Sequence, residues 1–379
     1  MIKILLGGSP CTYWSIAKTQ NRETTPSGLG WELFENYLIA KEKFQPDVFI
    51  YENNQSAATA IKEEIRNRFG CDEEPNSPKY IEIDSALVSA QSRKRFYVHN
   101  CGDVRQPADR GILLRDIIEN GVVEREKAYC LTRHEGNTRD YFQKRQTNLV
   151  FSPVRIGTIE NEAKNKGHDS KQYRVYSVDG KATTLCGEGG GLGAKTGLYA
   201  CPIDQSQAEI LKSSGGIKSR SPGAPTPVYE VKDGQILIKG HKYPINLQDG
   251  YYIIRKLTVK ECCQLQTLPD NYCRAVSATQ AYCGLGNCWT AEVIIHILNG
   301  ALQNVPRDEK LLVLSLYDGI GTGQYCLDKM GFTNVEYHSF EIDKYAMQIA
   351  QSNYPDIIQH GDAFQVRDES FALCGNVGG

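Results

Sequence analysis

Residues 311–323 read LLVLSLYDGIGTG, an apolar run of strand length that ends in a turn with glycines at 319, 321 and 323. Glycines in such a turn let a ligand approach the backbone at the carboxyl edge of a sheet. Turns of this kind serve many nucleotides, and some serve none. The sequence lacks the Gly-Lys-Ser/Thr that a triphosphate-binding loop would carry next.

Two acidic residues follow the glycine turn at informative distances. Glu341 ends the next expected strand, EYHSFEID, about 20 residues on, where a carboxylate can bind ribose hydroxyls. Asp362 ends a third strand-like piece in HGD and can accept a hydrogen bond from an adenine amino group. This spacing fits an adenosyl cofactor.

Outward from this stretch, further apolar runs of strand length alternate with helix-length segments, which indicates a βαβ sheet. The expected strands are 2–6, 48–51, 79–84, 95–100 and 311–317, and the expected helices are 57–69, 324–330, 344–352 and 289–302. Thr258 and Glu261 predict a capping box at the start of one more helix. We therefore expect an α/β fold.

The middle of the chain, residues 101–254, differs in character. It is rich in Gly, Pro and Tyr, and it contains hairpin signals at 178–180 and 232–234, which predict a β-rich second domain. Residues 91–174 carry a net charge of +6, whereas residues 1–90 carry −4 and residues 255–379 carry −5. A basic middle between acidic ends suits a lobe that meets a polyanion, although an ordinary solvated surface would look similar.

Three more positions at strand ends carry reactive or charged groups. Cys11, in GGSPC, can present a thiol to a cleft, although it is one of thirteen cysteines. Glu52 begins ENN and could act on a ring nitrogen and an exocyclic amine together, or could only cap a helix. Arg93 and Arg95 fall on the same face if a strand begins there, facing phosphate and base or simply water.

Composition narrows the class of protein. The start, MIKILLGGSP, resembles neither a secretory signal nor a membrane span, so we expect no membrane association. Thirteen cysteines without a signal peptide favour free thiols in a reducing, cytoplasmic compartment. No Cys-x-x-Cys pair occurs, which argues against a structural zinc site, and we expect no metal.

Taken together, these motifs resemble those of the DNA cytosine-C5 methyltransferases over nearly the whole chain. The matching stretches are GGSPC, ENN, QSRKR, RKLTVKECCQLQTLPDNY, GLGNCW, DGIGTG, FEID and GD. Two small departures are ENN, where the family commonly has Glu-Asn-Val, and Tyr317, where Phe is common. One departure is large, because family members usually open with the glycine turn and reach Pro-Cys later. The order here looks circularly permuted, and a fragment completed by a partner polypeptide is the alternative.

The resemblance implies a Rossmann-like S-adenosylmethionine-dependent methyltransferase fold with a smaller β-rich target-recognition domain. Residues 1–100 would hold the nucleophile half of the catalytic domain, 101–254 the recognition domain, and 255–379 the rest with the cofactor half. In the circular order, the strand at 2–6 must pair with the strand at 311–317. Gly379 should then lie near Met1.

The resemblance also implies the roles of the site residues. Cys11 would attack C6 of a flipped cytosine, Glu52 would bind N3 and the exocyclic amine, Arg95 would hold O2, and Arg93 would support the thiol region or a phosphate. No residue is assigned as the base that removes the C5 proton; an ordered water is one candidate. S-adenosylmethionine, which leaves as S-adenosylhomocysteine, would contact Pro10, Asn287, Tyr317, Asp318, Gly319, Gly321, Gly323, Glu341, Ile342 and Asp362.

The segment QYRVYSVDGKATTLCGEGGGLGAKTG is similar to the target-recognition segment of bacterial restriction-modification members. It implies a guanine-reading role for Arg174, close backbone approach to DNA at Thr184, Gly189, Gly190 and Gly191, and phosphate contacts from Lys171 and Lys195. We expect a monomer in the cytoplasm, associated with the nucleoid through double-stranded DNA, and a cognate restriction endonuclease is a candidate partner. An RNA cytosine methyltransferase and a non-catalytic DNA-binding regulator are the rival functions.

Overall fold

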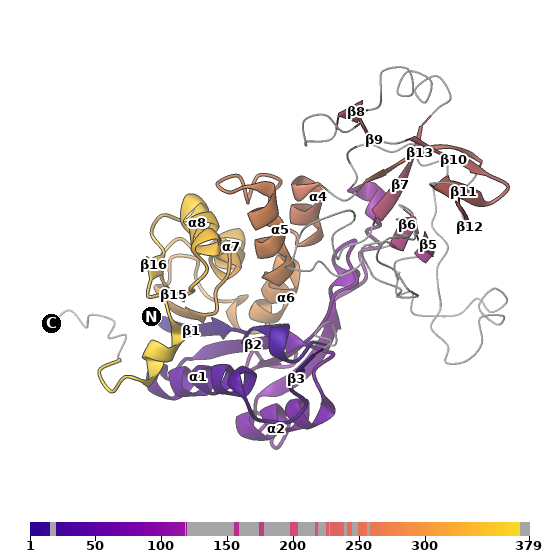
Figure 1. The fold of residues 1–379 in the computed structure, drawn as a ribbon. Coiled ribbons are helices and arrows are strands. Elements are labelled where there is room, and N and C mark those ends of the chain that lie inside the picture. Colours follow the sequence, from indigo (N-terminus) through magenta and orange to yellow (C-terminus); the bar gives the residue numbers. More distant parts are fainter. Residues whose placement is uncertain are drawn as a thin grey trace.

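A seven-stranded mixed sheet forms the centre of the molecule, in the order β16-β15-β14-β1-β2-β4-β3 (Figure 1). Its strands are β1 Ile2–Gly7, β2 Val48–Asn54, β3 Lys79–Asp84, β4 Lys94–His99, β14 Leu311–Leu316, β15 Val335–Phe340 and β16 Ile358–Gln359. Strands β16 to β2 run parallel, and β4 runs antiparallel to both β2 and β3. The α/β architecture expected from the sequence is thus confirmed, with one reversed strand that the sequence did not indicate.

The computed structural model describes the two ends of the chain almost completely and the middle in pieces. The described residues are 1–15, 20–117, 119, 155–158, 174–177, 198–203, 217–218, 225–226, 228–238, 241–244, 249–255 and 258–371.

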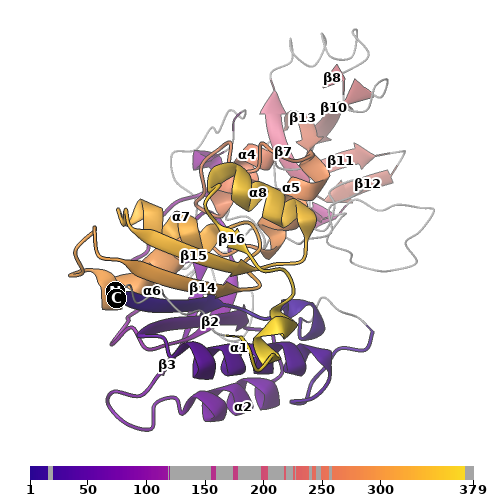
Figure 2. The ribbon, with the colours of Figure 1, turned by 90° about the vertical axis from the view of Figure 1, so that its left-hand side faces the viewer.

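Strands from opposite ends of the chain are neighbours at the centre of this sheet. β1 pairs in parallel with β14, from Ile2 opposite Leu311 to Gly7 opposite Leu316, as expected from the sequence (Figure 2). About 300 residues separate the two strands along the chain. Both strands are apolar, as sheets covered on both faces require.

Helices cover both faces of the sheet (Figure 2). They are α1 Leu29–Phe44, α2 Thr59–Phe69, α4 Val259–Leu265, α5 Ala278–Asn287, α6 Ala291–Leu302, α7 Thr322–Lys329 and α8 Lys344–Asn353. Successive side chains of a strand point to opposite faces, so Leu5 packs with α1 and α2 while Ile4 and Leu6 pack with helices from the C-terminal half. The result is a three-layer α/β/α arrangement.

The local signals for α4 were correct, whereas α1 was not expected. Thr258 Oγ1 accepts from the Glu261 N–H (3.2 Å), and Glu261 Oε2 accepts from the Thr258 N–H (2.7 Å), which completes the predicted capping box. Helix α1 instead begins after Gly28, which has φ +85° and provides no side-chain cap. A residue with a Cβ would be strained there. Short 3-10 turns occur at η1 Cys11–Tyr13, η2 Ser85–Leu87, η3 Leu114–Asp116 and η6 Ala363–Arg367.

A second sheet draws its strands from the middle of the chain, in the order β12-β11-β10-β13-β7-β6-β5. They are β5 Arg155–Thr158, β6 Arg174–Ser177, β7 Leu198–Ile203, β10 Val228–Lys232, β11 Gln235–Ile238, β12 His241–Pro244 and β13 Gly250–Arg255, and β8 Ile217–Lys218 pairs with β9 Pro225–Thr226. Asp233 and Gly234, both at positive φ, form the predicted hairpin turn between β10 and β11. The hairpin signal at 178–180 lies outside the described residues.

The start of the middle region packs against the first sheet and its helices, whereas we expected a domain boundary at residue 101. Leu114 and Cys101 are buried in the core formed with α5 and α6, and Val104 and Ile112 pack against it. Arg110 also forms an ion pair with Glu292 of α6 (2.6 Å). These contacts place residues 101–117 with the core of the first sheet.

The far end of the described chain returns to the nucleophile half. Arg367 of η6 donates to the Glu32 carbonyl of α1 (3.2 Å), and Lys43 Nζ donates to the Asp368 carbonyl (2.7 Å). Next to it, Lys3 Nζ of β1 donates to the Phe44 carbonyl at the end of α1 (3.2 Å). The yellow η6 accordingly lies against α1 in Figure 1. The expected proximity of Gly379 to Met1 lies outside the described residues.

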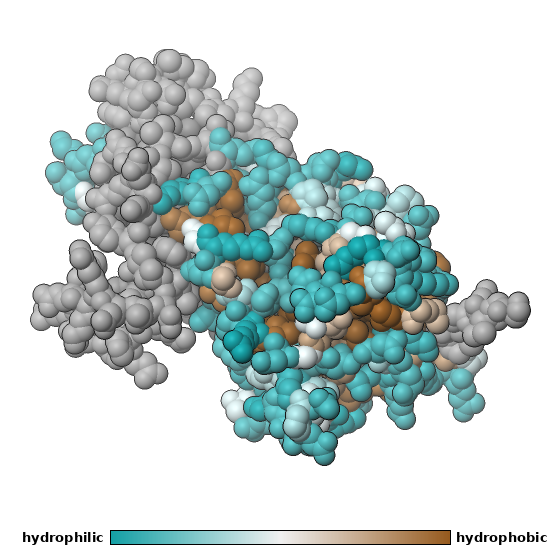
Figure 3. Space-filling model, turned by 180° about the vertical axis from the view of Figure 1, so that it is seen from behind, coloured by the Kyte–Doolittle hydropathy of each residue, from teal (hydrophilic) through white to brown (hydrophobic). Residues whose placement is uncertain are grey.

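The described surface is mainly polar. Figure 3 shows a face on which hydrophilic residues predominate, with hydrophobic ones visible in the hollows between them. Within the part of the chain that the structure describes, no helix has both the length and the apolar character that a bilayer crossing demands.

Candidate active site

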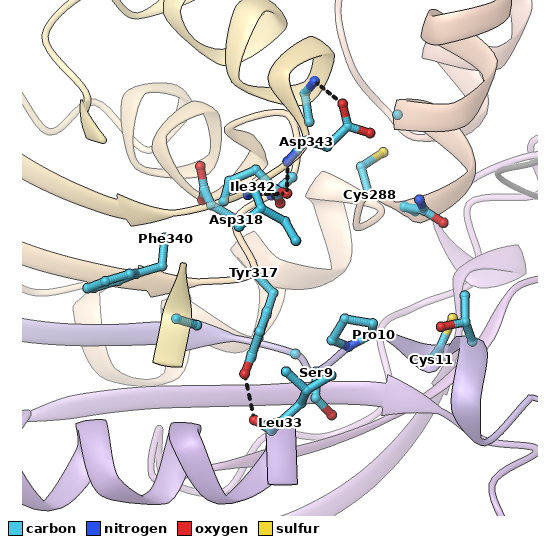
Figure 4. A pocket seen from close by; sticks show the side chains of 18 of the residues that line it. Ser9, Pro10, Cys11, Leu33, Cys288, Tyr317, Asp318, Phe340, Ile342 and Asp343 are labelled. Atoms are coloured by element: carbon cyan, nitrogen blue, oxygen red, sulfur yellow. Dashed lines mark hydrogen bonds between the residues drawn. The ribbon is translucent and has the colours of Figure 1, made fainter. Parts of the chain in front are cut away.

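A cavity of about 400 Å³ opens where β1, β2, β14 and β15 end. Figure 4 shows side chains from the turns after β1, β14 and β15 converging on this space. The predicted residues that line it are Pro10, Cys11, Glu52, Arg93, Arg95, Asn287, Tyr317, Asp318, Gly319, Glu341, Ile342 and Asp362. The fold thus gathers residues from both ends of the chain into one cavity.

Two thiols line the cavity, and their surroundings differ. Cys11 is the first residue of η1, directly after Pro10, and is half-buried. Cys288 follows α5, and burial raises its pKa to about 12, so this thiol stays protonated at neutral pH. Of the two thiols, Cys11 is therefore the more exposed one, and Cys288 is the one that burial keeps protonated.

Glu52, at the end of β2, is held from both sides. Its Oε1 accepts from Arg95 Nε at 2.9 Å, and its Oε2 accepts from the indole Nε1 of Trp289 at 3.3 Å. All three residues are buried. Gly8 approaches the same residue so closely that a Cβ there would lie 2.5 Å from the Glu52 carbonyl oxygen. The position and the plane of this carboxylate are therefore well defined.

Arg93 and Arg95 both face the cavity, as their alternate spacing predicted, but they make different contacts. Arg93 donates from Nη1 to the Gly286 carbonyl (3.2 Å) and from Nη2 to the Cys288 carbonyl (2.9 Å). Burial and the nearby charge of Arg95 lower the pKa of Arg93. These contacts tie the start of β4 to the turn after α5, which favours support of the thiol region over a phosphate contact for Arg93.

A buried polar network fixes the loop that carries Cys11. Asn53 Nδ2 donates to the Ser9 carbonyl (2.9 Å) and contacts the Tyr51 hydroxyl (3.2 Å), which lies 2.8 Å from Ser9 Oγ. Burial raises the pKa of Tyr51, so its hydroxyl remains protonated. Buried hydrogen-bond networks of this kind rigidify their surroundings, so the turn after β1 is held to β2.

At the opposite end of the cavity, Glu341 closes the turn after β15. Its carboxylate accepts from the backbone N–H groups of Gly319, Ile342 and Asp343, each at 2.8 Å. Burial raises the pKa of Glu341, while these backbone donors favour its ionised form. A carboxylate offers about four lone-pair sites, so at least one remains for a ligand hydroxyl.

The turn after β14 is held by side-chain contacts. Asp318 Oδ1 accepts from Ser315 Oγ (2.7 Å) and from the Tyr337 hydroxyl (2.6 Å), and burial raises the pKa of Asp318. Tyr317 has φ +59° and donates its hydroxyl hydrogen to the Leu33 carbonyl of α1 at 2.7 Å (Figure 4). A phenylalanine would lack this bond between the glycine turn and α1.

The family model of the C-5 cytosine-specific DNA methylases matches residues 1–302. The chain belongs to this family. As a C-5 cytosine-specific DNA methylase it is a DNA cytosine-5 methyltransferase, an enzyme that transfers a methyl group to cytosine. The family as a whole acts on DNA and depends on S-adenosylmethionine.

Solved structures of methyltransferases align with this family member. The Entamoeba histolytica methyltransferase EhMeth is 12% identical, with 80% of this chain and 78% of that chain covered and a TM-score of 0.43. The Dnmt2 methyltransferase of S. pombe is 14% identical (78% and 77% covered, TM-score 0.39), and a Spodoptera frugiperda DNMT2 mutant is 16% identical (78% and 78%, TM-score 0.37). No match was found among curated proteins.

The glycines of the turn after β14 divide into two kinds. Gly319, at φ +64°, lines the cavity, and a Cβ there would meet nothing within 4 Å, so its surroundings leave room for a ligand. Gly321 and Gly323, which we expected at the cofactor, are not among the lining residues. A Cβ on Gly321 would meet Ala350 at 3.0 Å, and one on Gly323 would meet the Tyr337 hydroxyl at 2.3 Å. These two glycines are required by packing.

Several residues that line the cavity were not expected from the sequence. Most residues expected to read DNA lie outside the described part of the chain. Trp289 is the most consequential omission, because neither its position after GLGNC nor its type indicates that it contacts Glu52. Gln280 and Gly284 of α5, Leu33 of α1 and Tyr345 of α8 also line the cavity. Of the residues expected to read DNA, Lys171, Thr184, Gly189, Gly190, Gly191 and Lys195 lie outside the described residues, and only the backbone of Arg174, in β6, is described.

Proposed function

We propose that this enzyme methylates C5 of cytosine within a specific sequence of duplex DNA, by way of a flipped base and a covalent bond between Cys11 and C6. The observation that carries the proposal is the shared cavity, because Cys11, the Glu52 carboxylate and the glycine turn after β14 all line it. A reaction that joins a cofactor group to a base needs these parts within one enclosed space. A stacked base cannot enter such a cavity, so the target cytosine must leave the duplex.

The cavity fits an adenosyl cofactor. Its volume of about 400 Å³ lies in the range of small-molecule sites, and Glu341 and Asp362 offer carboxylate acceptors to hydroxyl and amino groups. Open space beside Gly319 leaves the backbone accessible. Pro10, Tyr317, Asp318 and Ile342 would complete the enclosure, with Asn287 from the end of α5. S-adenosylmethionine, when bound, supplies an electrophilic methyl group.

Cys11 begins the reaction as a thiolate. Its Sγ forms a bond to C6 of the ring, and the electron pair of the C5–C6 double bond is displaced toward C5 and the N3 side of the ring. Arg93 is a buried cation close enough to interact with Cys11. The ring becomes nucleophilic at C5 only while the sulfur–carbon bond exists.

Glu52 and Arg95 hold the base and offset the charge that develops on it. A protonated Glu52 donates to N3, transfers its proton there as the ring gains electron density, and accepts from the exocyclic amine. Arg95 donates hydrogen bonds to Glu52 and to the Lys94 carbonyl (2.9 Å). A guanidinium has five N–H groups, so others remain to donate to O2 of the base.

The second half of the reaction restores the enzyme. After C5 has gained the methyl group, a base removes the C5 proton, and its electron pair forms the C5–C6 double bond again. The C6–Sγ bond breaks, Cys11 leaves as a thiolate, and the N3 proton returns to Glu52.

The middle region is proposed as the DNA-recognition part. Residues 118–174, which follow the part that packs on the first sheet, carry a net charge of +3, and this excess of cations favours contact with phosphates. Arg174 is proposed to read guanine from β6. A monomer in the cytoplasm, with a cognate restriction endonuclease as a partner, completes the proposal.

A trapping experiment tests this mechanism. Duplex DNA with 5-fluorocytosine at the target site should form a complex with the wild-type enzyme and S-adenosylmethionine that survives denaturation, because fluorine cannot leave C5 as a proton does. Bisulfite sequencing of DNA from cells that express the enzyme identifies the target site first. Methyl transfer to tRNA but not to duplex DNA would contradict the DNA assignment, and failure to trap would contradict the covalent step.

We also propose that the family's motif order is circularly permuted in this chain. The parallel pairing of β1 with β14 supports this, since it places the Pro-Cys turn beside the glycine turn. A rotated chain tests it: Gly379 is linked to Met1 through a short Gly/Ser spacer, and the chain is opened before Lys310. This protein should fold and methylate DNA. A soluble rotated protein with no cofactor binding would contradict the proposal.

A further inference from the structure

Trp289 contacts the catalytic carboxylate directly, although no motif assigned it a role. Its indole Nε1 donates to Glu52 Oε2 at 3.3 Å, and the side chain is only 8% exposed while lining the cavity. Arg95 occupies the other carboxylate oxygen at 2.9 Å. The two donors therefore hold Glu52 by different oxygens.

The backbone on both sides of Trp289 is anchored. The preceding carbonyl, of Cys288, accepts from Arg93 Nη2 at 2.9 Å. The following side chain, of Thr290, donates to Gln266 Oε1 (2.9 Å) and accepts from Ser85 Oγ (2.9 Å). A side chain between two fixed neighbours loses little further freedom when it forms its hydrogen bond, so the indole is preorganised for Glu52.

The location of this hydrogen bond gives it a chemical consequence. An N–H that donates to a carboxylate stabilises the ionised form more than the protonated form. In a buried site such a bond is stronger than in water. Trp289 therefore favours the state of Glu52 that arises when its proton has moved to the base.

We propose that Trp289 is a positioning residue for Glu52. It fixes the plane of the carboxylate against the target base and stabilises the charge that Glu52 acquires as N3 becomes protonated. The inference rests on the proposed function, because it assigns Glu52 the contact with N3.

Other groups also act on Glu52 and must be held constant in a test. Arg95 of β4 and Arg93 just before it are the nearby cations, and Tyr97 lies opposite Glu52 in the register between β2 and β4. Tyr51 is its neighbour in β2, with a hydroxyl bound to Ser9. The thiols Cys11 and Cys288 line the same cavity. None of these is changed by a substitution at Trp289.

The substitution Trp289→Phe keeps an aromatic ring and removes the N–H. Single-turnover methyl transfer to duplex DNA is measured across pH. We expect a rate lower by about tenfold and a pH midpoint of the transfer rate that is higher by about one unit, which corresponds to one charge-assisted hydrogen bond. The midpoint rises because the ionised form has lost a donor. DNA and cofactor affinities should change little.

Trp14 offers a matched control. Its indole Nε1 also donates to a carboxylate, Glu23 Oε2 at 3.1 Å, and it is fully buried, but it does not line the cavity. Trp14→Phe should lower the thermal midpoint of unfolding without moving the pH midpoint of transfer. An equal fall in rate at every pH in Trp289→Phe would overturn the proposal, because it indicates packing alone. An unchanged rate would overturn it as well.

The failure of this inference is distinguishable from that of the proposed function. If the wild type forms the 5-fluorocytosine complex and Trp289→Phe has a wild-type pH profile, only the positioning role is wrong. If the wild type forms no such complex, the covalent mechanism itself is wrong.

Discussion

Replacement of Cys11 by alanine should abolish methyl transfer, with a fall on the order of 10⁴–10⁶-fold in single-turnover rate. The variant has no sulfur to bond with C6, so C5 of the base is never activated. The cofactor end of the cavity, at Tyr317, Gly319 and Glu341, is built from other elements and should be intact. Calorimetric titration with S-adenosylmethionine should therefore give nearly the wild-type affinity.

Cys288 supplies the control for this variant. It lines the same cavity, but burial raises its pKa to about 12, so it is not a thiolate at neutral pH. Cys288→Ala should still yield the denaturation-resistant complex with 5-fluorocytosine DNA, and Cys11→Ala should not. Full transfer activity in Cys11→Ala would be incompatible with the covalent mechanism.

Gly8→Ala should lower the transfer rate on the order of 10²-fold, because it displaces the Glu52 carboxylate, which we propose binds the base. The new Cβ would lie 2.5 Å from the Glu52 carbonyl oxygen and 3.0 Å from its Oε2. Backbone cannot yield to such a contact as a flexible side chain can, so the end of β2 must move. Misplacement by about 1 Å is enough for an effect of this size. The readout is the single-turnover rate of the folded enzyme, with folding checked by circular dichroism.

The adjacent glycine separates crowding of the strand from displacement of Glu52. A Cβ on Gly7 would lie 2.9 Å from the Leu316 carbonyl oxygen and from the ring of Tyr37, both away from Glu52. Each variant should lose about 1–3 kcal/mol of unfolding free energy through overpacking. Transfer by folded Gly7→Ala should exceed that by folded Gly8→Ala, and equal rates would show that Glu52 is not the sensitive element.

Much of the first sheet could be predicted because its strands are buried on both faces and therefore read as short apolar runs. Residues 79–84 match β3 at both ends, and the strand expected at 48–51 extends to Asn54. Helix α1 could not be predicted in this way, since it begins after Gly28, which provides no side-chain cap. The reversed direction of β4 depends on pairing with β2 and β3, which local sequence does not encode.

In the candidate site, too, some residues could be predicted from the sequence and others could not. Cys11 and Glu52 could be found because reactive side chains at the ends of parallel strands meet at one edge of the sheet. The contacts of Arg93 and Trp289 could not, since both reach partners more than 190 residues away in the sequence. Gly321 and Gly323 resembled ligand-binding glycines, but their neighbours Ala350 and Tyr337 explain them. A glycine in a motif therefore indicates that some group lies close to the backbone, but it does not show whether that group is a ligand or a side chain of the protein.

The pairing of β1 with β14 also sets the order of events during synthesis. The ribosome completes β1 about 300 residues before β14, which is about 15–60 s at 5–20 residues per second. For that interval one edge of β1 lacks its neighbour, and apolar side chains such as Ile4 and Leu6 lack the C-terminal helices that cover them. Exposed strand edges and apolar surface attract other chains. We therefore expect the nascent enzyme to be most prone to aggregation until its last strands emerge.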